Sequence, residues 1–303
     1  MTRPAPRSID QYLSQLRDAL RGEDPALLQD ALYDAEEYLR AELAQHPGKS
    51  EADVLELIAS TYGAPDEVAE AYRSSEKTVR EALKPAAPPA RSTTLGRFFD
   101  VYADSRAWTA LFYMLLALVT GIFYFTVTVT GLSMSFGLAF LVVGVPFFLL
   151  FIGFTRVLSL VEGRLVEGLL GVRMPRRPVR STHGASLWQR IREMLTDRRT
   201  WTTLLYMLLM LPLGIGYFAL VTVGLAASLA MIGTPALKLL HYAGVSVDSV
   251  HLYHGFYEVS WLHALAHTVI GVLMLTVLLH VVRGIGGLHG RIARELLLSQ
   301  DGE

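Results

Sequence analysis

Long apolar runs separated by short charged stretches dominate the last two thirds of the chain. No Asp, Glu, Lys or Arg occurs in residues 107–155, 200–237 or 259–282. A bilayer core about 30 Å thick is crossed by about 20 helical residues, so the first run holds two spans and a turn. The pattern therefore predicts four transmembrane helices, at about 108–132, 135–155, 201–226 and 259–282.

The apolar part of the chain contains an internal repeat. Residues 106–132 and 199–225 lie 93 positions apart and are identical at 15 of 27 positions. Such a repeat predicts two copies of one helical hairpin. Gly-Val-Pro at 144–146 corresponds to Gly-Thr-Pro at 233–235, where the second copy is expected to turn back. Polar residues then interrupt this copy, so residues 228–258 are predicted to form either an outer loop or a re-entrant segment.

Arginines mark one side of the two hairpins. Residues 156–199 contain ten arginines and four acidic residues, whereas the loops at 131–137 and 238–258 contain one Lys and no Arg. The positive-inside rule therefore predicts a multi-pass protein with cytoplasmic N- and C-termini. Amphipathic sequences on the same side predict interfacial helices, at about 156–171, 187–198 and 284–298.

Aromatic and basic residues at this boundary are predicted to anchor the chain in the membrane rather than to contact a ligand, because such residues are enriched at the membrane–water interface. The predicted anchors are Trp108, Trp188, Trp201, Arg106 and Arg199. Asp104 and Asp197 lie two residues before the anchoring arginines, where an intrahelical or inter-repeat ion pair is expected.

The first 80 residues form a separate acidic module. They hold 16 acidic and 9 basic residues, whereas the other 223 hold 12 acidic and 18 basic residues. Helical periodicity from Tyr12 onward, with helix-end signals at Pro25 and Gly63, predicts a small bundle at 8–80. A Pro/Ala linker at 81–94 joins it to a membrane domain at 95–298. The predicted fold class is all-α: a soluble helical bundle followed by a polytopic domain of two repeated hairpins.

Only one cluster of side chains is a candidate for site chemistry. His254, Glu258, His263 and His267 follow one another at intervals of four or five, so 254/258 and 263/267 would each share a helix face and could bind a metal ion. These histidines could instead sense pH or hydrogen-bond a neighbouring helix. The chain has no cysteine, which excludes thiolate sites, and it has no Walker loop. No catalytic residue and no cofactor are predicted, and the chain is not expected to be an enzyme.

Both halves of the chain resemble bacterial modules. Tyr12-Leu13, the acidic residues 34–39 and the stretch 62–69 are similar to the HAAS signalling domain. The repeated Arg-x-Trp-Thr and Tyr-Met-Leu-Leu motifs resemble the "putative sensor" membrane domain. The resemblance implies the bacterial cytoplasmic (inner) membrane and a partner of the PadR type of transcriptional regulator. It carries over no catalytic residue.

Two functions follow from these features. The first is a membrane sensor that relays a membrane or extracytoplasmic stimulus through residues 8–80 to a cytoplasmic protein; the acidic domain could also dock on the basic segment 156–199 as an off state. The alternative is a transporter or ABC-type permease subunit or accessory protein, because transport pathways use repeats and broken helices. The lipid bilayer and a cytoplasmic protein are the predicted partners. Small residues could pair copies into a homo-oligomer, and direct nucleic-acid binding is not expected.

Overall fold

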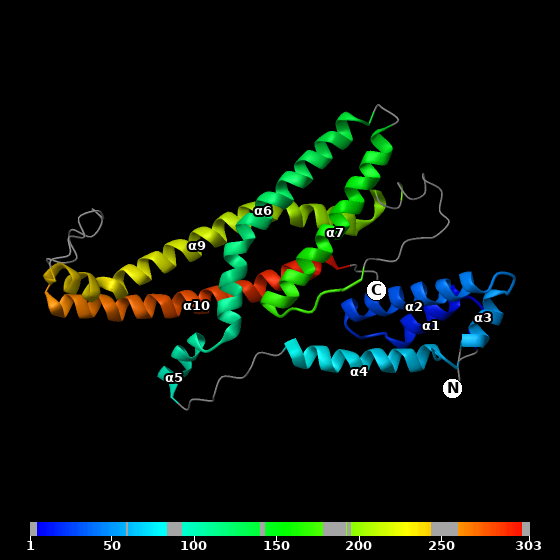
Figure 1. The fold of residues 1–303 in the computed structure, drawn as a ribbon, viewed down its shortest axis with the longest axis horizontal. Coiled ribbons are helices and arrows are strands. Elements are labelled where there is room, and N and C mark those ends of the chain that lie inside the picture. The colour runs from blue at the N-terminus through cyan, green and yellow to red at the C-terminus, as the bar shows by residue number, and fades with distance from the viewer. Residues whose placement is uncertain are drawn as a thin grey trace. The chain divides into compact units, whose positions relative to one another are not determined.

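A computed structural model shows helices throughout the part of the chain that it describes, which is residues 5–58, 60–83, 93–139, 143–177, 192, 195–243 and 260–298 (Figure 1). No strand occurs in these ranges, and this confirms the all-α class with a helical membrane domain. The chain forms two compact units: Met1–Lys84 with Val127–Met207 and Gly290–Glu303, and Pro85–Thr126 with Leu208–His289.

The N-terminal bundle consists of α1 (Ile9–Ala19), α2 (Pro25–Gln45), α3 (Glu51–Ile58) and α4 (Pro65–Leu83). Side chains that recur at helical spacing on these elements share one apolar core: Ile9, Tyr12, Leu13, Leu16, Leu20, Leu27, Ala31, Leu32, Ala35, Leu39, Leu55, Ile58, Val68 and Ala69. This core positions the acidic face of α2, which contacts the chain beyond α7.

Short polar residues begin and end these helices. The Asp24 carboxylate accepts the Ala26 amide at 2.9 Å and so caps α2. Ser50 and Asp53 form a reciprocal capping box, with amide-to-side-chain distances of 3.1 and 3.2 Å. The hydrogen bonds from Ser50 lower the pKa of Asp53 below its ordinary value. Gly63, two residues before α4, adopts a φ of 98°, a left-handed conformation that glycine adopts without strain.

The membrane part follows a short helix α5 (Thr94–Phe99) and the 3-10 turn η1 (Asp100–Tyr102). Its helices are α6 (Ser105–Gly137), α7 (Gly144–Leu170), α9 (Arg198–Tyr242) and α10 (Trp261–Leu297). Each of these four contains a stretch long and apolar enough to cross a membrane.

The predicted turn between the first two spans, after residue 132, lies several residues too early in the chain. Helix α6 continues through 131–135 to Gly137, and α7 begins only at Gly144. Gly131 and Ser135 lie inside α6, where the Ser135 hydroxyl donates to the Gly131 carbonyl at 2.6 Å. Pro146 is tolerated because it lies in the first turn of α7, where an amide has no intrahelical acceptor.

The predicted interfacial segments 156–171 and 284–298 do not form separate helices, because α7 runs on to Leu170 and α10 to Leu297 without interruption. Helical glycines such as Gly284 cost about 1 kcal/mol each, which burial of an apolar face can offset. Helix α9 likewise continues past 233–235 to Tyr242, with Pro212 and Pro235 inside it. The prediction that the chain turns back at 233–235 is therefore wrong. A helix in a bilayer tolerates proline where neighbouring groups satisfy the freed backbone carbonyl. Residues 244–259 lie outside the described ranges.

Equivalent glycines bring α6 and α9 into backbone contact. A Cβ built on Gly121 would lie 2.5 Å from the Met210 carbonyl oxygen, and one on Gly214 would lie 2.4 Å from that of Ala117. Gly121 and Gly214 are 93 residues apart, and so are Ala117 and Met210. The two first helices of the repeat therefore cross where only glycine leaves room for the neighbouring backbone.

Candidate functional site

The start of each repeat is fixed by the same set of contacts. Asp104 Oδ1 accepts the Arg106 amide at 3.0 Å, and Asp197 Oδ1 accepts the Arg199 amide at 3.0 Å. Both aspartates also form ion pairs, Asp104 with Arg283 at 2.8 Å and Asp197 with Arg156 at 3.6 Å. These aspartates thus cap helices and bind arginines of a return helix, Arg156 of α7 and Arg283 of α10.

The predicted anchors Trp108 and Trp201 are half exposed, and each indole has a defined acceptor. Trp108 Nε1 donates to the Tyr102 carbonyl at 3.0 Å, and Trp201 Nε1 donates to the Leu195 carbonyl at 2.8 Å. Each indole ring is exposed while its single N–H donor is hydrogen-bonded, an arrangement that suits an interfacial anchor. Trp188 lies outside the described residues.

Buried polar pairs connect the first and return helices further along the repeat. Tyr113 Oη is hydrogen-bonded to His289 Nε2 at 2.7 Å, and Tyr217 Oη to His289 Nδ1 at 3.2 Å. In the other unit, the Tyr206 hydroxyl donates to Glu162 Oε1 at 2.8 Å. Tyr113 and Tyr206 are equivalent, and so are Glu162 and His289, each directly before the glycine of the shared Gly-Arg motif.

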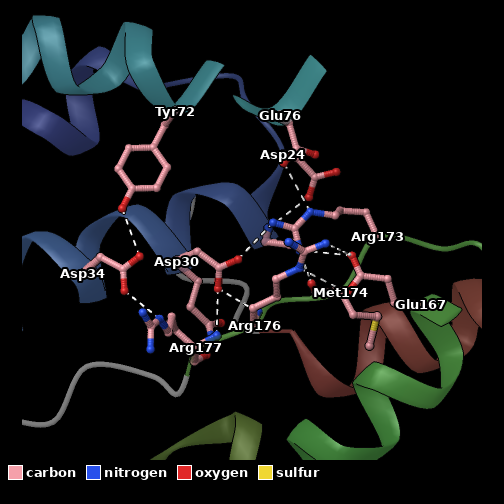
Figure 2. Close-up of polar contacts among 12 residues, drawn as sticks. Asp24, Asp30, Asp34, Tyr72, Glu76, Glu167, Arg173, Met174, Arg176 and Arg177 are labelled. Carbon is pink, nitrogen blue, oxygen red and sulfur yellow. Dashed lines mark hydrogen bonds and ion pairs between the residues drawn. The ribbon is translucent and has the colours of Figure 1, made fainter. Parts of the chain in front are cut away.

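The guanidinium group of Arg173, just beyond the end of α7, organises a highly charged site. Arg173 donates to Asp30 of α2 at 2.9 Å, to Glu76 of α4 at 3.2 Å and to Glu167 of α7 at 3.4 Å (Figure 2). Its side chain is 9% exposed, so these charges interact largely out of water. It also donates to the Met174 carbonyl. A buried guanidinium with three carboxylates is well paired, and removal of one partner would be costly.

Asp30 binds both the side chain and the backbone of the segment that follows α7. Its Oδ2 accepts Arg173, while its Oδ1 accepts the amides of Arg176 at 2.7 Å and Arg177 at 2.8 Å. Burial raises the pKa of Asp30 above its ordinary value, and the hydrogen bonds from Arg173 and from the two amides oppose that shift. The charged form of this carboxyl therefore depends on the segment that covers it.

Two further acidic contacts extend the site along α2. Arg177 Nε lies 2.6 Å from Asp34 Oδ1, and the Tyr72 hydroxyl donates to Asp34 Oδ2 at 3.0 Å (Figure 2). Arg176 pairs with Glu167 at 3.2 Å. A cavity of about 410 Å³ lies among these groups, lined on one side by α2 and α4 and on the other by Arg164 and the 173–177 arginines.

The bundle is also held by the beginning of α9 and the end of α10. Arg199 Nη1 donates to Gln29 Oε1 at 3.1 Å, and Arg294 Nη2 donates to Asp24 Oδ2 at 3.1 Å. Arg199, predicted as a membrane anchor, thus contacts the N-terminal bundle. Helix α2 therefore receives side chains from both hairpins.

The segment after α7 lies against both glycines of the repeated Gly-Arg motif. A Cβ on Gly290 would lie 2.5 Å from Val172 Cγ2, and a Cβ on Gly163 would lie 3.5 Å from Met174 Cβ. Met174 is 1% exposed. Residues 172–174 thus pack on both return helices immediately before their arginines enter the acidic face of α2.

The predicted histidine site lies only partly within the described residues. His254 and Glu258 are outside them, and His263 Nδ1 lies 2.7 Å from the Ser260 hydroxyl. Within the described ranges, no three His, Cys, Asp or Glu side chains lie close enough to hold a metal ion.

Sequence reasoning assigned no residue of the Arg173 cluster to a site, although it allowed the acidic domain to dock on the basic segment. The positive-inside rule already explains an arginine-rich stretch next to a membrane helix. The pattern therefore did not indicate that these arginines also bind the N-terminal bundle. The available signal was the spacing of Asp30 and Asp34, one helical turn apart on α2, opposite an Arg-x-x-Arg-Arg segment.

Comparison with known families identifies the membrane part. No curated protein and no solved structure matches the chain. Residues 113–297 match the family described as "Putative sensor". The match leaves out residues 8–80, whose resemblance to the HAAS domain stays a prediction. Because the match covers more than half of the 303 residues, the chain belongs to the "Putative sensor" family of membrane proteins.

Proposed function

We propose that this protein is a bacterial inner-membrane signalling protein that relays a membrane or extracytoplasmic stimulus to a cytoplasmic partner through its N-terminal bundle. Membership of a sensor family and four membrane-length helices support the sensor role. The positive-inside bias supports cytoplasmic N- and C-termini. In this proposal the chain is not an enzyme, and its partners are the lipid bilayer and a cytoplasmic protein.

The observation that carries the proposal is the attachment of α2 to both hairpins. Asp30 binds Arg173 beyond α7, Gln29 binds Arg199 of α9, and Asp24 binds Arg294 of α10. A change in the position of either hairpin would alter at least one of these contacts. A stimulus can shift such an equilibrium only through a difference in free energy between the docked and released bundle, and a cluster of ion pairs supplies such a difference.

The resemblance of residues 8–80 to the HAAS domain suggests a PadR-type regulator as the cytoplasmic partner. The bundle has its own apolar core, so it can keep its fold when its contacts with 173–177 are lost. In the released state its acidic α2 face would be open to that partner.

The experiment is site-specific photocrosslinking in native membranes from exposed Glu70 on α4. The full-length chain is compared with Arg173→Ala, which opens the cluster, and with Arg21→Ala, whose side chain is 84% exposed, as matched control. We expect Arg173→Ala to change the yield of one crosslinked cytoplasmic protein at least severalfold, and Arg21→Ala to leave it unchanged. No crosslinked protein in any variant, or equal yields in all three, would contradict the proposal.

A further inference from the structure

We infer that the acidic face formed by α2 and α4 binds an extended, arginine-rich segment of a protein partner, and that residues 173–177 occupy this face as an internal competitor. The inference rests on the proposed function and names the chemistry of the partner. The acidic face is defined by Asp30, Asp34, Tyr72 and Glu76.

The structure shows this face occupied by a peptide segment. Residues 171–175 have no regular secondary structure, and 176–177 form a bend. Asp30 Oδ1 accepts two successive backbone amides, which the bend at 176–177 allows and the interior of a helix does not. Arg173 and Arg177 then bind Asp30 and Asp34, four residues apart on α2. The face thus binds the side chains of an Arg-x-x-x-Arg spacing, while the Arg176 guanidinium pairs with Glu167 of α7.

Nearly all of these contacts belong to the bundle itself. Of the carboxylates around Arg173, only Glu167 comes from the membrane part, whereas Asp30 and Glu76 come from the bundle. A segment of another protein with the same spacing would therefore recover the contacts with the bundle, but not those with Glu167 or the packing of residues 172–174 on the return helices. The tethered segment is present at an effective concentration of about millimolar, so a partner gains the face only when the segment is loosened.

The chemistry of the face selects guanidinium groups. One planar guanidinium binds Asp30 and Glu76 through different nitrogens, which an ammonium group cannot do with the same geometry. Arg177 also lies 5.9 Å from the centre of the Tyr33 ring, within the range of a cation–π contact. The three carboxylates repel anionic lipid and nucleic acid, so a basic peptide is the occupant that the face favours.

The test measures binding of a fluorescent peptide, Gly-Val-Arg-Met-Pro-Arg-Arg, to purified full-length protein by fluorescence anisotropy. The Arg173→Ala/Arg176→Ala/Arg177→Ala variant removes the competitor and keeps the face. We expect it to bind the peptide at least about tenfold more tightly than the unmodified chain. Arg7→Ala/Arg17→Ala/Arg21→Ala removes the same charge from exposed positions of the bundle and is expected to bind like the unmodified chain.

The Asp30→Asn/Glu76→Gln variant distinguishes release of residues 173–177 from recognition of the peptide by the acidic face. This variant also releases the segment but lacks the face, so we expect no gain in affinity. A peptide with lysine at its three arginine positions is expected to bind at least about fivefold more weakly. No gain in the arginine-free variant, an equal gain in the face variant, or equal binding of both peptides would overturn the inference.

A measurement on the unmodified chain covers the case in which the triple variant does not fold. Excess peptide is expected to speed amide hydrogen exchange of residues 173–177, because the two segments compete; unchanged exchange at saturating peptide would overturn the inference. Failure of these tests with a crosslinked partner still present would leave the signalling function standing and place the partner elsewhere on the bundle. Success without any crosslinked partner would instead contradict the signalling function.

Discussion

The two hairpins share their construction and differ where they meet the N-terminal bundle. Asp104 and Asp197 cap the first helices in the same way, and Gly121 and Gly214 make the same close crossing. On the return helices, however, Glu162 and Glu167 of α7 correspond to His289 and Arg294 of α10. The repeat thus provides a common frame, and the charges at the ends of its return helices are specific to each copy.

This difference gives the two copies opposite roles toward the same bundle. Glu167 accepts arginines of the 173–177 segment and so helps to hold that segment against α2. Arg294, at the equivalent position, donates directly to Asp24 at the start of α2. One copy therefore acts through an intervening basic segment, and the other acts by direct contact.

Charge reversal at the two equivalent positions should give the largest contrast. Glu167→Arg places a third guanidinium beside Arg173 and Arg176 in a buried cluster, and we expect it to weaken docking of the bundle by about 3–5 kcal/mol. Arg294→Glu affects a side chain that is 35% exposed and should cost only about 1 kcal/mol. Amide exchange of α2 in the purified chain measures both. Equal loss of protection in the two variants would show that the copies do not differ in this way.

The glycine crossing should respond equally in the two copies. Gly121→Ala and Gly214→Ala each force a Cβ against backbone, so each is expected to lower the free energy of unfolding by about 1–3 kcal/mol. Gly216→Ala is the matched control because a Cβ there meets nothing within 4 Å. Titration with a denaturing detergent provides the measurement. Tolerance of alanine at one position alone would break the equivalence of the two crossings.

Substitution of the equivalent buried tyrosines compares the polar pairs of the two copies, with a smaller expected effect. Tyr206→Phe removes a donor from the Glu162 carboxyl and is expected to cost about 1.5 kcal/mol of unfolding free energy. Tyr113→Phe removes one of two tyrosine partners of His289 and is expected to cost about 1 kcal/mol. The same detergent titration compares them. A larger loss in Tyr113→Phe would place the more important polar pair in the second return helix.

The ion pairs at the helix starts should contribute least. Arg156→Ala and Arg283→Ala break pairs in which the arginine side chains are 38% and 51% exposed. Solvent screening limits the expected loss to less than about 1 kcal/mol each. Repeating the titration at high salt should remove most of it. A loss of about 3–5 kcal/mol, which is typical of breaking a buried pair, would contradict this assignment.

The sequence was most informative where a pattern had a single physical meaning. Uncharged runs of membrane length predicted four helices, and the helical spacing of apolar residues such as Tyr12 and Leu16 predicted the core of the bundle. Helix ends were less predictable, because Gly131 and Pro235 can end a helix in water and are tolerated inside long apolar ones. The Arg173 cluster was not predicted for another reason: Glu76 and Asp30 lie 97 and 143 residues from Arg173, and local spacing does not reveal such partners.

The contact of Asp30 with two backbone amides has an evolutionary consequence. Side chains at positions 176 and 177 could be exchanged over generations without loss of those two hydrogen bonds, because every residue except proline offers the same amide. Position 173 has no such freedom, since its guanidinium fills the space between two helices of the bundle. Among relatives, drift at 176 together with constancy at 30, 173 and 177 would be the trace that this site leaves, because the Arg177 side chain also binds Asp34.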